Sequence, residues 1–211
     1  MADSALLTQL QQGCESLGIA LDHDQQQQLL RYVALMHKWN KVYNLTSVRD
    51  PAQMMSRHII DSLSVLPYLN APSLLDVGTG GGLPGIPAAI AHPDSAVTLL
   101  DSNSKKTRFL QQVKAELGLS NVTVVHGRVE QVSLSKFAII TARAFASIDD
   151  IIELAGQHCE HGGQLVLMKG VYPAEELAFD SSAFHLGDVV TLKVPGCDGE
   201  RHLVRLIKEK G

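Results

Sequence analysis

Apolar residues in the first part of the chain recur at the three- and four-residue spacing that is typical of amphipathic helices. Leu29, Val33 and Met36 belong to one such stripe, which predicts a helix over residues 24–41 with Asp24 as its N-cap. Trp39 continues the same spacing, so we favour core packing for its ring over stacking on a ligand, which stays the alternative for Trp39 and Tyr43.

A second helix is predicted over residues 51–65. Asp50 is suited to cap it, and Pro51 fits the first turn, where a missing N–H costs little. Pro67 is expected to end it. Because strand signals are scarce before position 70, we predict that residues 1–70 form an N-terminal helical region packed on the rest.

From Ser73 onward, short β-rich runs alternate with helical patterns. This alternation predicts right-handed crossovers and a parallel sheet with helices on both faces. The predicted strands are 74–77, 97–100, 122–125, 137–140 and 164–168, and the predicted helices are 85–91, 105–117 and 148–157.

The end of the chain departs from this alternation. After a short helix over 174–178, two apolar runs at 189–194 and 202–207 are separated by a turn at 195–199. We expect these runs to form an antiparallel hairpin at one edge of the sheet. Residues 71–211 are therefore predicted to form one α/β domain of Rossmann-like type with seven strands.

Composition narrows the class of protein. The 211 residues are 45% hydrophobic, and the three cysteines have neither disulfide-framework nor metal-ligand spacing. We find no signal-peptide pattern and no apolar run long enough to cross a bilayer, so we expect a cytoplasmic protein without a bound metal. A net charge of −4 argues against a protein that coats nucleic acid, although it allows local basic patches.

A glycine-rich segment follows the first predicted strand. Asp76 is followed by glycines at alternate positions, Gly78, Gly80 and Gly82, which let the backbone approach a ligand and turn into a helix. Leu83 stands where a dinucleotide-binding loop needs a small residue, so a nicotinamide cofactor is disfavoured. An acidic residue before the loop suits a ligand with an ammonium group.

The second predicted strand ends in Asp101. A carboxylate at this edge accepts two hydroxyl hydrogen bonds from a ribose and disfavours a nearby phosphate. The loop and this acid together favour a nucleoside bearing an amino-acid moiety over a purely structural turn.

The two motifs together resemble those of class I methyltransferases that use S-adenosylmethionine. Across nearly the whole chain, the sequence is similar to the bacterial 16S rRNA guanine-N7 methyltransferases, the RsmG or GidB family. The strings that carry this resemblance are HKWNK at 37–41, YNLTSVRDP at 43–51, RHI at 57–59, DS at 61–62, GLPGIP at 82–87, RAF at 143–145, KG at 169–170 and GERH at 199–202.

The resemblance implies a function and a set of site residues. The reaction transfers a methyl group from S-adenosylmethionine to N7 of a guanine in 16S rRNA of the small ribosomal subunit, leaving S-adenosylhomocysteine. Gly78 and Leu83 line the cofactor pocket, Val129 and Glu130 lie beside the adenine, and Arg143 reaches the cofactor. Arg143 ends a very apolar strand, so an anionic partner is expected for it, and a structural salt bridge is the alternative to a ligand.

Guanine N7 carries a lone pair and no proton, so the reaction needs no general base. The fourth predicted strand runs into Thr141–Ala144 and lacks the Asp/Asn-Pro-Pro-aromatic segment of exocyclic-amine methyltransferases. We therefore expect no catalytic base, with Arg143 orienting an anionic group, and we interpret His58 and Asp61 as an internal pair. The cations that we expect to contact RNA phosphates are Lys38, Lys41, Arg49, Arg57, Arg201 and Arg205.

Two alternative functions remain open at this point. One is a small-molecule methyltransferase, because the cofactor motif is silent about the acceptor. The other is an RNA-binding ribosome-assembly factor that keeps a vestigial cofactor pocket. A monomer is expected in either case.

Overall fold

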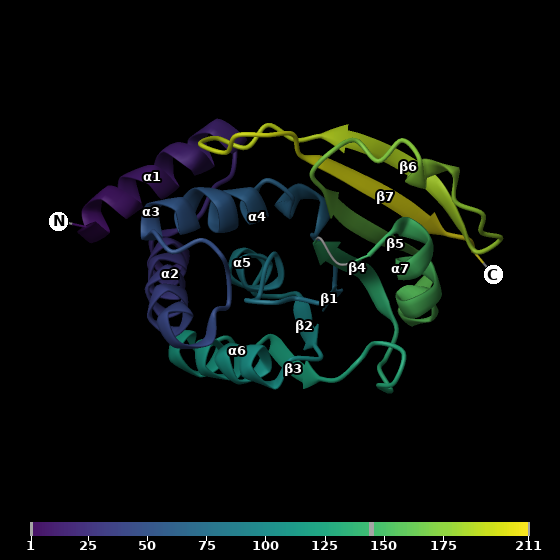
Figure 1. The fold of residues 1–211 in the computed structure, drawn as a ribbon, viewed down its shortest axis with the longest axis horizontal. Helices are drawn as coiled ribbons and strands as arrows, with labels where there is room; N and C mark the ends of the chain where they lie inside the picture. Colours follow the sequence, from purple (N-terminus) through teal and green to yellow (C-terminus); the bar gives the residue numbers. More distant parts are fainter. Residues whose placement is uncertain (1, 144–145, 211) are drawn as a thin grey trace.

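A seven-stranded sheet forms the centre of the computed structural model, which describes residues 2–143 and 146–210 (Figure 1). The strands are β1 (Ser73–Val77), β2 (Ala96–Asp101), β3 (Val122–His126), β4 (Phe137–Arg143), β5 (Cys159–Lys169), β6 (Phe184–Thr191) and β7 (His202–Lys208). Their order is β3-β2-β1-β4-β5-β7-β6, and β7 runs antiparallel to both of its neighbours. The predicted fold class, including the antiparallel pair at the edge, is confirmed.

The bounds predicted for the sixth strand were wrong. β6 begins at Phe184 and ends at Thr191, whereas the sequence pattern indicated 189–194. Gly187 and Asp188 interrupt the apolar run, yet the ladder passes through them with a register shift between Leu186 and Asp188. The connection to β7 is correspondingly longer than the predicted five-residue turn.

The N-terminal region begins with two long helices, α1 (Ala2–Leu17) and α2 (His23–Tyr43). The N-cap of α2 is Asp22, so the predicted cap, Asp24, was wrong. Asp22 Oδ1 accepts from Gln25 N (2.8 Å) while Gln25 Oε1 accepts from Asp22 N (2.9 Å), which completes a capping box that Asp24 does not form. The Trp39 ring lies 5.6 Å from that of Phe109, in agreement with its predicted core role.

The second predicted helix is a continuous helical segment with a change of winding in the middle. It consists of α3 (Pro51–Met54), a π-helical turn η1 (Met55–Ile60) and α4 (Asp61–Leu63). Asp50 caps it through Gln53 N (2.9 Å), as predicted, and a 3₁₀ turn η2 (Leu66–Tyr68) follows at Pro67. The π turn was not predicted.

Helices cover both faces of the sheet (Figure 1). Along the remaining chain these are α5 (Gly85–Ala91), α6 (Ser104–Leu117), α7 (Ile148–Ala155) and the 3₁₀ turns η3 (Gly156–His158) and η4 (Glu176–Ala178). One hydrophobic cluster runs from Leu10 and Tyr32 in the N-terminal helices to Phe109 in α6, and a second lies under α7. None of the helices in the described part of the chain is long and apolar enough to cross a membrane.

Candidate functional site

The segment after β1 forms a tight loop whose backbone requires glycine. Gly78, Gly80 and Gly82 have φ values of 65°, 62° and 95°, in the left-handed region that side chains disfavour. A Cβ atom on Gly82 would lie 2.6 Å from Ile86 Cγ1. From α2, the hydroxyl of the fully buried Tyr32 donates a hydrogen bond to the Gly81 carbonyl oxygen. The glycine spacing recognised in the sequence is thus a consequence of the loop conformation.

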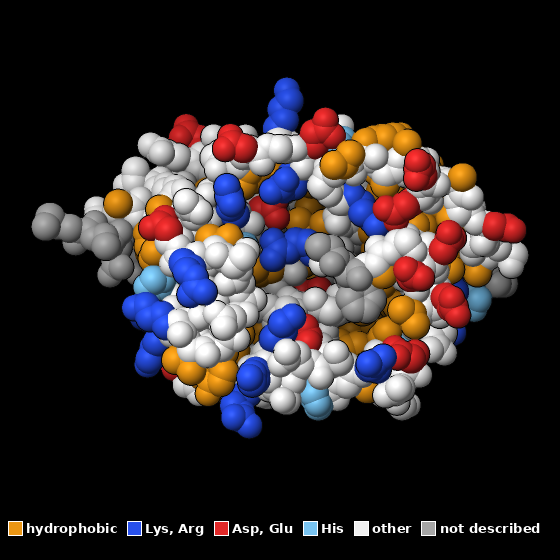
Figure 2. Space-filling view, viewed as in Figure 1, with side chains coloured by type: hydrophobic (Ala, Val, Ile, Leu, Met, Phe, Trp, Pro, Cys, Tyr) orange, Lys and Arg blue, Asp and Glu red, His pale blue; other side chains and the backbone are white. Residues whose placement is uncertain are grey.

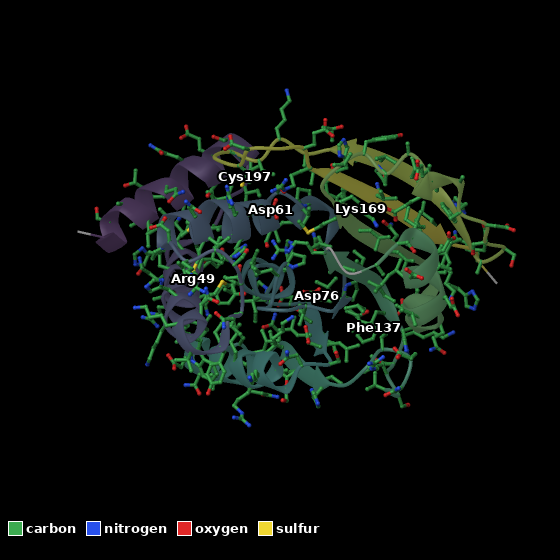
Figure 3. All side chains as sticks on the ribbon, viewed as in Figure 1. Arg49, Asp61, Asp76, Phe137, Lys169 and Cys197 are labelled. Carbon is green, nitrogen blue, oxygen red and sulfur yellow. The ribbon has the colours of Figure 1, made fainter. Side chains whose placement is uncertain are left out.

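Asp76 lies fully buried beneath this loop (Figure 3). Its Oδ2 accepts from Thr79 Oγ1 (2.7 Å) and from Gly85 N (2.8 Å), so it holds the loop and the start of α5. Its Oδ1 is buried and finds no hydrogen-bond donor among the described residues. Burial raises the pKa of this carboxyl from 3.8 to about 6, against the lowering effect of those two hydrogen bonds.

Asp101 ends β2 directly across from the loop. Its Oδ2 accepts from Gly80 N (2.9 Å) and lies 3.7 Å from Lys106 Nζ, while its Oδ1 accepts from Asn103 N (2.8 Å). Each oxygen retains acceptor capacity, because a carboxylate offers about four lone-pair sites. Asp101 therefore connects the glycine loop, β2 and α6 at the mouth of a cavity.

This first cavity has a volume of about 540 Å³. It contains four of the predicted cofactor residues, Gly78, Asp101, Val129 and Glu130, and the lining residues that were not predicted include Lys106 and Leu154. Val129 is 3% exposed and presents an apolar wall. The carboxyl ends of β1, β2 and β3 thus converge on one hollow, where open α/β sheets bind ligands.

A second cavity of about 570 Å³ adjoins the first and shares Gly78 and Lys106 with it. Of the predicted residues, it is lined by Gly80, Leu83, Arg143, Arg57 and Arg201. Figure 2 shows Lys and Arg side chains gathered around a hollow near the middle of this face. The chain therefore has a cavity with two acids and two cations in its lining beside a predominantly basic one.

Two predicted cofactor residues line neither cavity. These are Asp76, which lies beneath the loop, and Gly82, which packs against Ile86 and Tyr32. Asp76 supports the loop from below, and Gly82 belongs to the loop itself. Their predicted contact with the ligand stays a prediction.

Comparison with known proteins shows which family the chain belongs to. The family model for rRNA small subunit methyltransferase G (GidB) matches residues 25–204. Ribosomal RNA small subunit methyltransferase G of Pseudomonas aeruginosa PAO1 is 52% identical over 204 residues, covering 94% of each chain. The Marinobacter nauticus protein of the same name is 49% identical, covering 93% of this chain and 92% of its own.

The chain belongs to the rRNA small subunit methyltransferase G family. A solved structure of a SAM-dependent methyltransferase from Aquifex aeolicus shares the fold, with a TM-score of 0.58 and 17% identity over 78% of this chain and 97% of that one. The sequence resemblance that rested on motif strings is confirmed by these matches. The RAF string at 143–145 is only partly visible in the structure, because Ala144 and Phe145 lie outside the described residues.

In this member of the family, the predicted pairing of His58 with Asp61 was wrong. His58 Nε2 lies 2.8 Å from Thr46 Oγ1, and its Nδ1 lies 3.0 Å from the Arg57 carbonyl oxygen. Asp61 instead forms ion pairs with Arg143 and Arg201. His58 lies within the π turn, and Asp61 is the first residue after it.

His58 is a poor candidate for a general base in this family member. Burial, followed by the nearby Arg143 guanidinium, lowers its pKa from 6.5 to about 4. The imidazole is therefore neutral at physiological pH, and its weak basicity suits a hydrogen-bonding role. The structural salt bridge that was the alternative for Arg143 is present, with Asp61 Oδ2 at 3.2 Å from Nη1.

The six predicted RNA-contacting cations divide into two groups. Arg57 and Arg201 line the second cavity, whereas the other four do not. Lys38 borders a separate hollow of about 220 Å³ against α6, and Arg49 Nη2 donates to Asn44 Oδ1 at 3.2 Å. Arg205 forms an ion pair with Asp188 at 3.0 Å on the far strands, and Lys41 is exposed on α2.

No group of three or more His, Cys, Asp or Glu side chains is arranged to hold a metal ion in residues 2–143 and 146–210. The cysteines in that part of the chain are free. The residues that sequence reasoning missed are Asp61 and Lys106. Asp61 was named only as a partner of His58, and the partners that the structure gives to Asp61 and Lys106 are brought close only by the fold.

Proposed function

We propose that this protein transfers a methyl group from S-adenosylmethionine to N7 of a guanine in 16S rRNA of the small ribosomal subunit. The observation that carries the proposal is the pair of adjoining cavities that share Gly78 and Lys106 in a chain of this family. One cavity suits a nucleoside with a ribose diol, and the other opens to a basic surface. The acceptor nitrogen and the methyl donor would meet at the shared wall.

The residues of the first cavity fit the cofactor. Asp101 presents remaining acceptor sites to the ribose hydroxyls, and Val129 and Glu130 offer an apolar wall and an acceptor beside the adenine. Beneath the loop and outside the lining of both cavities, the unpartnered Oδ1 of Asp76 is proposed to accept from the ammonium group of the amino-acid end. When bound, S-adenosylmethionine supplies an electrophilic methyl group on a sulfonium.

The chain's own residues are left with positioning and exclusion of water. Guanine N7 needs no deprotonation, and the neutral His58 is engaged with Thr46. Orientation of two bound reactants contributes up to about 7–11 kcal/mol to lowering a barrier. Arg143, at the wall of the second cavity, is proposed to orient an anionic group there.

The basic side chains around the second cavity suit a nucleic-acid acceptor. Arg57 is exposed at its rim, and Lys169 Nζ is held by Glu176 (2.7 Å) and the Ala146 carbonyl oxygen (2.9 Å). N7 lies on an edge of guanine that is inaccessible in the deep groove of A-form RNA. The target guanine is therefore expected in a loop or an unstacked position.

Mass spectrometry of rRNA from cells with and without the gene tests this function. We expect one N7-methylguanosine in 16S rRNA that disappears on deletion and returns on complementation. Labelled cofactor incubated with purified small subunits or with metabolite pools supplies the biochemical test. A methyl group transferred to a metabolite while 16S rRNA stays unmodified would contradict the proposal, and cofactor binding without any turnover would favour an assembly factor.

A further inference from the structure

Asp61 occupies an unusual position at the base of the second cavity (Figure 3). Its Oδ1 accepts from Arg201 Nε at 2.9 Å, and its Oδ2 accepts from Arg143 Nη1 at 3.2 Å. The carboxylate side chain is 4% exposed, whereas the two guanidinium side chains are 25% and 27% exposed. One buried carboxylate thus anchors two arginines whose other ends reach the cavity.

The three side chains leave a local excess of positive charge. Two guanidiniums share one carboxylate, so the group carries a net charge of +1 by this count. Arg143 Nη2 and Arg201 Nη2 make no hydrogen bond within residues 2–143 and 146–210. Planar guanidiniums with free N–H groups match the geometry of a phosphate or a carboxylate.

The three residues come from three different parts of the fold. Asp61 begins α4, Arg143 ends β4, and Arg201 lies in the segment between β6 and β7. That segment runs over α4 toward α1 (Figure 1), and Cys197 Sγ donates to the Ser56 carbonyl oxygen at 3.2 Å. The position of Arg201 therefore depends on the contact between this segment and the N-terminal helices.

We propose that Asp61 is a positioning residue that holds Arg143 and Arg201 as a single clamp for an oxyanion in the second cavity. This inference rests on the proposed function and adds a residue to it. The oxyanion has two possible sources, a phosphate of the bound RNA and the carboxylate of the cofactor. Asp61 orients the two guanidiniums without touching the ligand, because its oxygens face the arginines.

Asp61→Asn separates positioning from attraction. The substitution keeps the volume but replaces one acceptor oxygen with a donor, so one guanidinium loses its anchor. It also removes a negative charge beside the RNA, so RNA affinity should stay within about threefold of wild type or become tighter. The single-turnover methylation rate of 16S rRNA should nevertheless fall roughly 10- to 100-fold, as expected for misplaced groups. A merely structural role would weaken both properties together.

Arg201→Lys and Arg201→Met provide variants that do not leave a buried charge unpaired. Lys keeps the charge but lacks the planar fork, so we expect the rate loss of Asp61→Asn without a change in the salt dependence of RNA binding. If the clamp holds RNA phosphate, Met should in addition bring the slope of log affinity against log salt about 0.7 closer to zero. Asp188→Asn is the matched control, because it breaks an Arg–Asp pair of similar length away from both cavities.

Cofactor binding distinguishes the two sources of the oxyanion. S-adenosylhomocysteine carries the carboxylate, whereas methylthioadenosine lacks the amino-acid portion. If the clamp holds RNA phosphate, Asp61→Asn binds both ligands as wild type does. If it holds the cofactor, Asp61→Asn and Arg143→Met weaken S-adenosylhomocysteine about tenfold and leave methylthioadenosine unchanged.

Wild-type turnover and S-adenosylhomocysteine affinity in a folded Asp61→Asn protein would overturn the clamp. A parallel loss of RNA affinity and rate, with a lower melting temperature, would also overturn it and make Asp61 a structural residue. Failure of the wild-type protein to methylate 16S rRNA would instead contradict the proposed function, since the cofactor measurements do not depend on RNA.

Discussion

Asp76 is the residue at which the demands of folding and of ligand binding differ most. The carboxyl is fully buried, and one oxygen has no donor in the described part of the chain. The pKa of this carboxyl is about 6 in the folded protein and 3.8 ordinarily. Between these two values the group stays protonated in the folded state, whereas it ionises in the unfolded chain. The free energy of unfolding therefore decreases as pH rises from about 4 to about 6, and it stays lower above that range.

Asp76→Asn should remove this decrease in the free energy of unfolding at higher pH. The amide keeps an oxygen acceptor for Thr79 and Gly85 and does not ionise. The variant should be more stable than wild type at pH 8, by up to about 3 kcal/mol for a shift of two pKa units, with little difference near about pH 3.5. Urea unfolding at the two pH values measures this. An equal difference at both would show that ionisation of Asp76 is not the cause.

Asp101→Ala should weaken S-adenosylhomocysteine binding by about 1.5–3 kcal/mol through loss of charge-assisted hydrogen bonds. Part of this loss would come from the loop, because Asp101 also anchors Gly80 N. Asp94→Ala, an exposed acid just before β2, is the control for net charge. Calorimetry that gives the same affinity for wild type and a folded Asp101→Ala protein would remove Asp101 from the cofactor site.

His58 allows the absence of a general base to be tested. With a pKa of about 4, it is neutral throughout the range from pH 6 to 9 and cannot produce a rising limb there. Single-turnover rates should change less than about threefold across this range, in wild type and in His58→Ala. A tenfold rise with an apparent pKa near 6.5, lost in His58→Ala, would make His58 a catalytic base.

Sequence reasoning at this scale placed side chains correctly where their location follows from a strand end or from the family resemblance. Asp101 was expected at the end of the second strand and Glu130 from the resemblance, and both line the first cavity. The ion pairs of Asp61 were not predicted, since its two partners lie 82 and 140 residues away along the chain. Its environment exists only after α4, β4 and the segment before β7 have come together.

Among the elements, the turn from β1 into α5 carries the strictest steric requirement. A Cβ atom on Gly85 would lie 2.8 Å from Asp76 Oδ2 and would also contact the Leu99 side chain. Gly85→Ala should therefore reduce the free energy of unfolding by about 1–3 kcal/mol, as overpacking does in a filled core. Gly170→Ala is the control, because its Cβ would meet nothing within 4 Å. Equal thermal or urea stability of the two variants would show that the turn relaxes.

Periodicity predicted most elements but not their irregularities. The helix from Pro51 was recognised from its cap and spacing, yet its π turn has no pattern of its own. That turn contains Arg57 and His58, which line the second cavity. In proteins, π turns are frequent at functional sites. Likewise, the predicted bounds of β6 were too far along the chain, because Gly187 and Asp188 weaken the apolar alternation while backbone pairing with β7 continues through them.

For the whole molecule, the decisive property is how charge is distributed and not its sum. The net charge is −4, but the second cavity is lined by five Lys or Arg side chains and one acid. Lys106 and Lys169 are paired with Asp101 and Glu176, and Arg143 and Arg201 share Asp61. The positive charge that remains to attract phosphates is that of Arg57 and of the Arg143–Asp61–Arg201 group. This distribution favours binding at one site over coating of the surface.

RNA binding should therefore weaken with salt to an extent set by the cavity alone. Two to three neutralised phosphates predict a slope of log affinity against log salt of about −1.4 to −2.1 for a single-stranded target, or roughly 7- to 18-fold between about 50 and 200 mM. Titration of a labelled 16S rRNA fragment at several salt concentrations measures the slope. Arg57→Ala should bring the slope about 0.7 closer to zero. Lys136 is an exposed cation just before β4, at the amino end of that strand and away from the cavities, so Lys136→Ala should not change the slope. Equal effects of the two variants would mean that attraction comes from scattered surface charge, and a slope near zero would mean that RNA is not held through its phosphates.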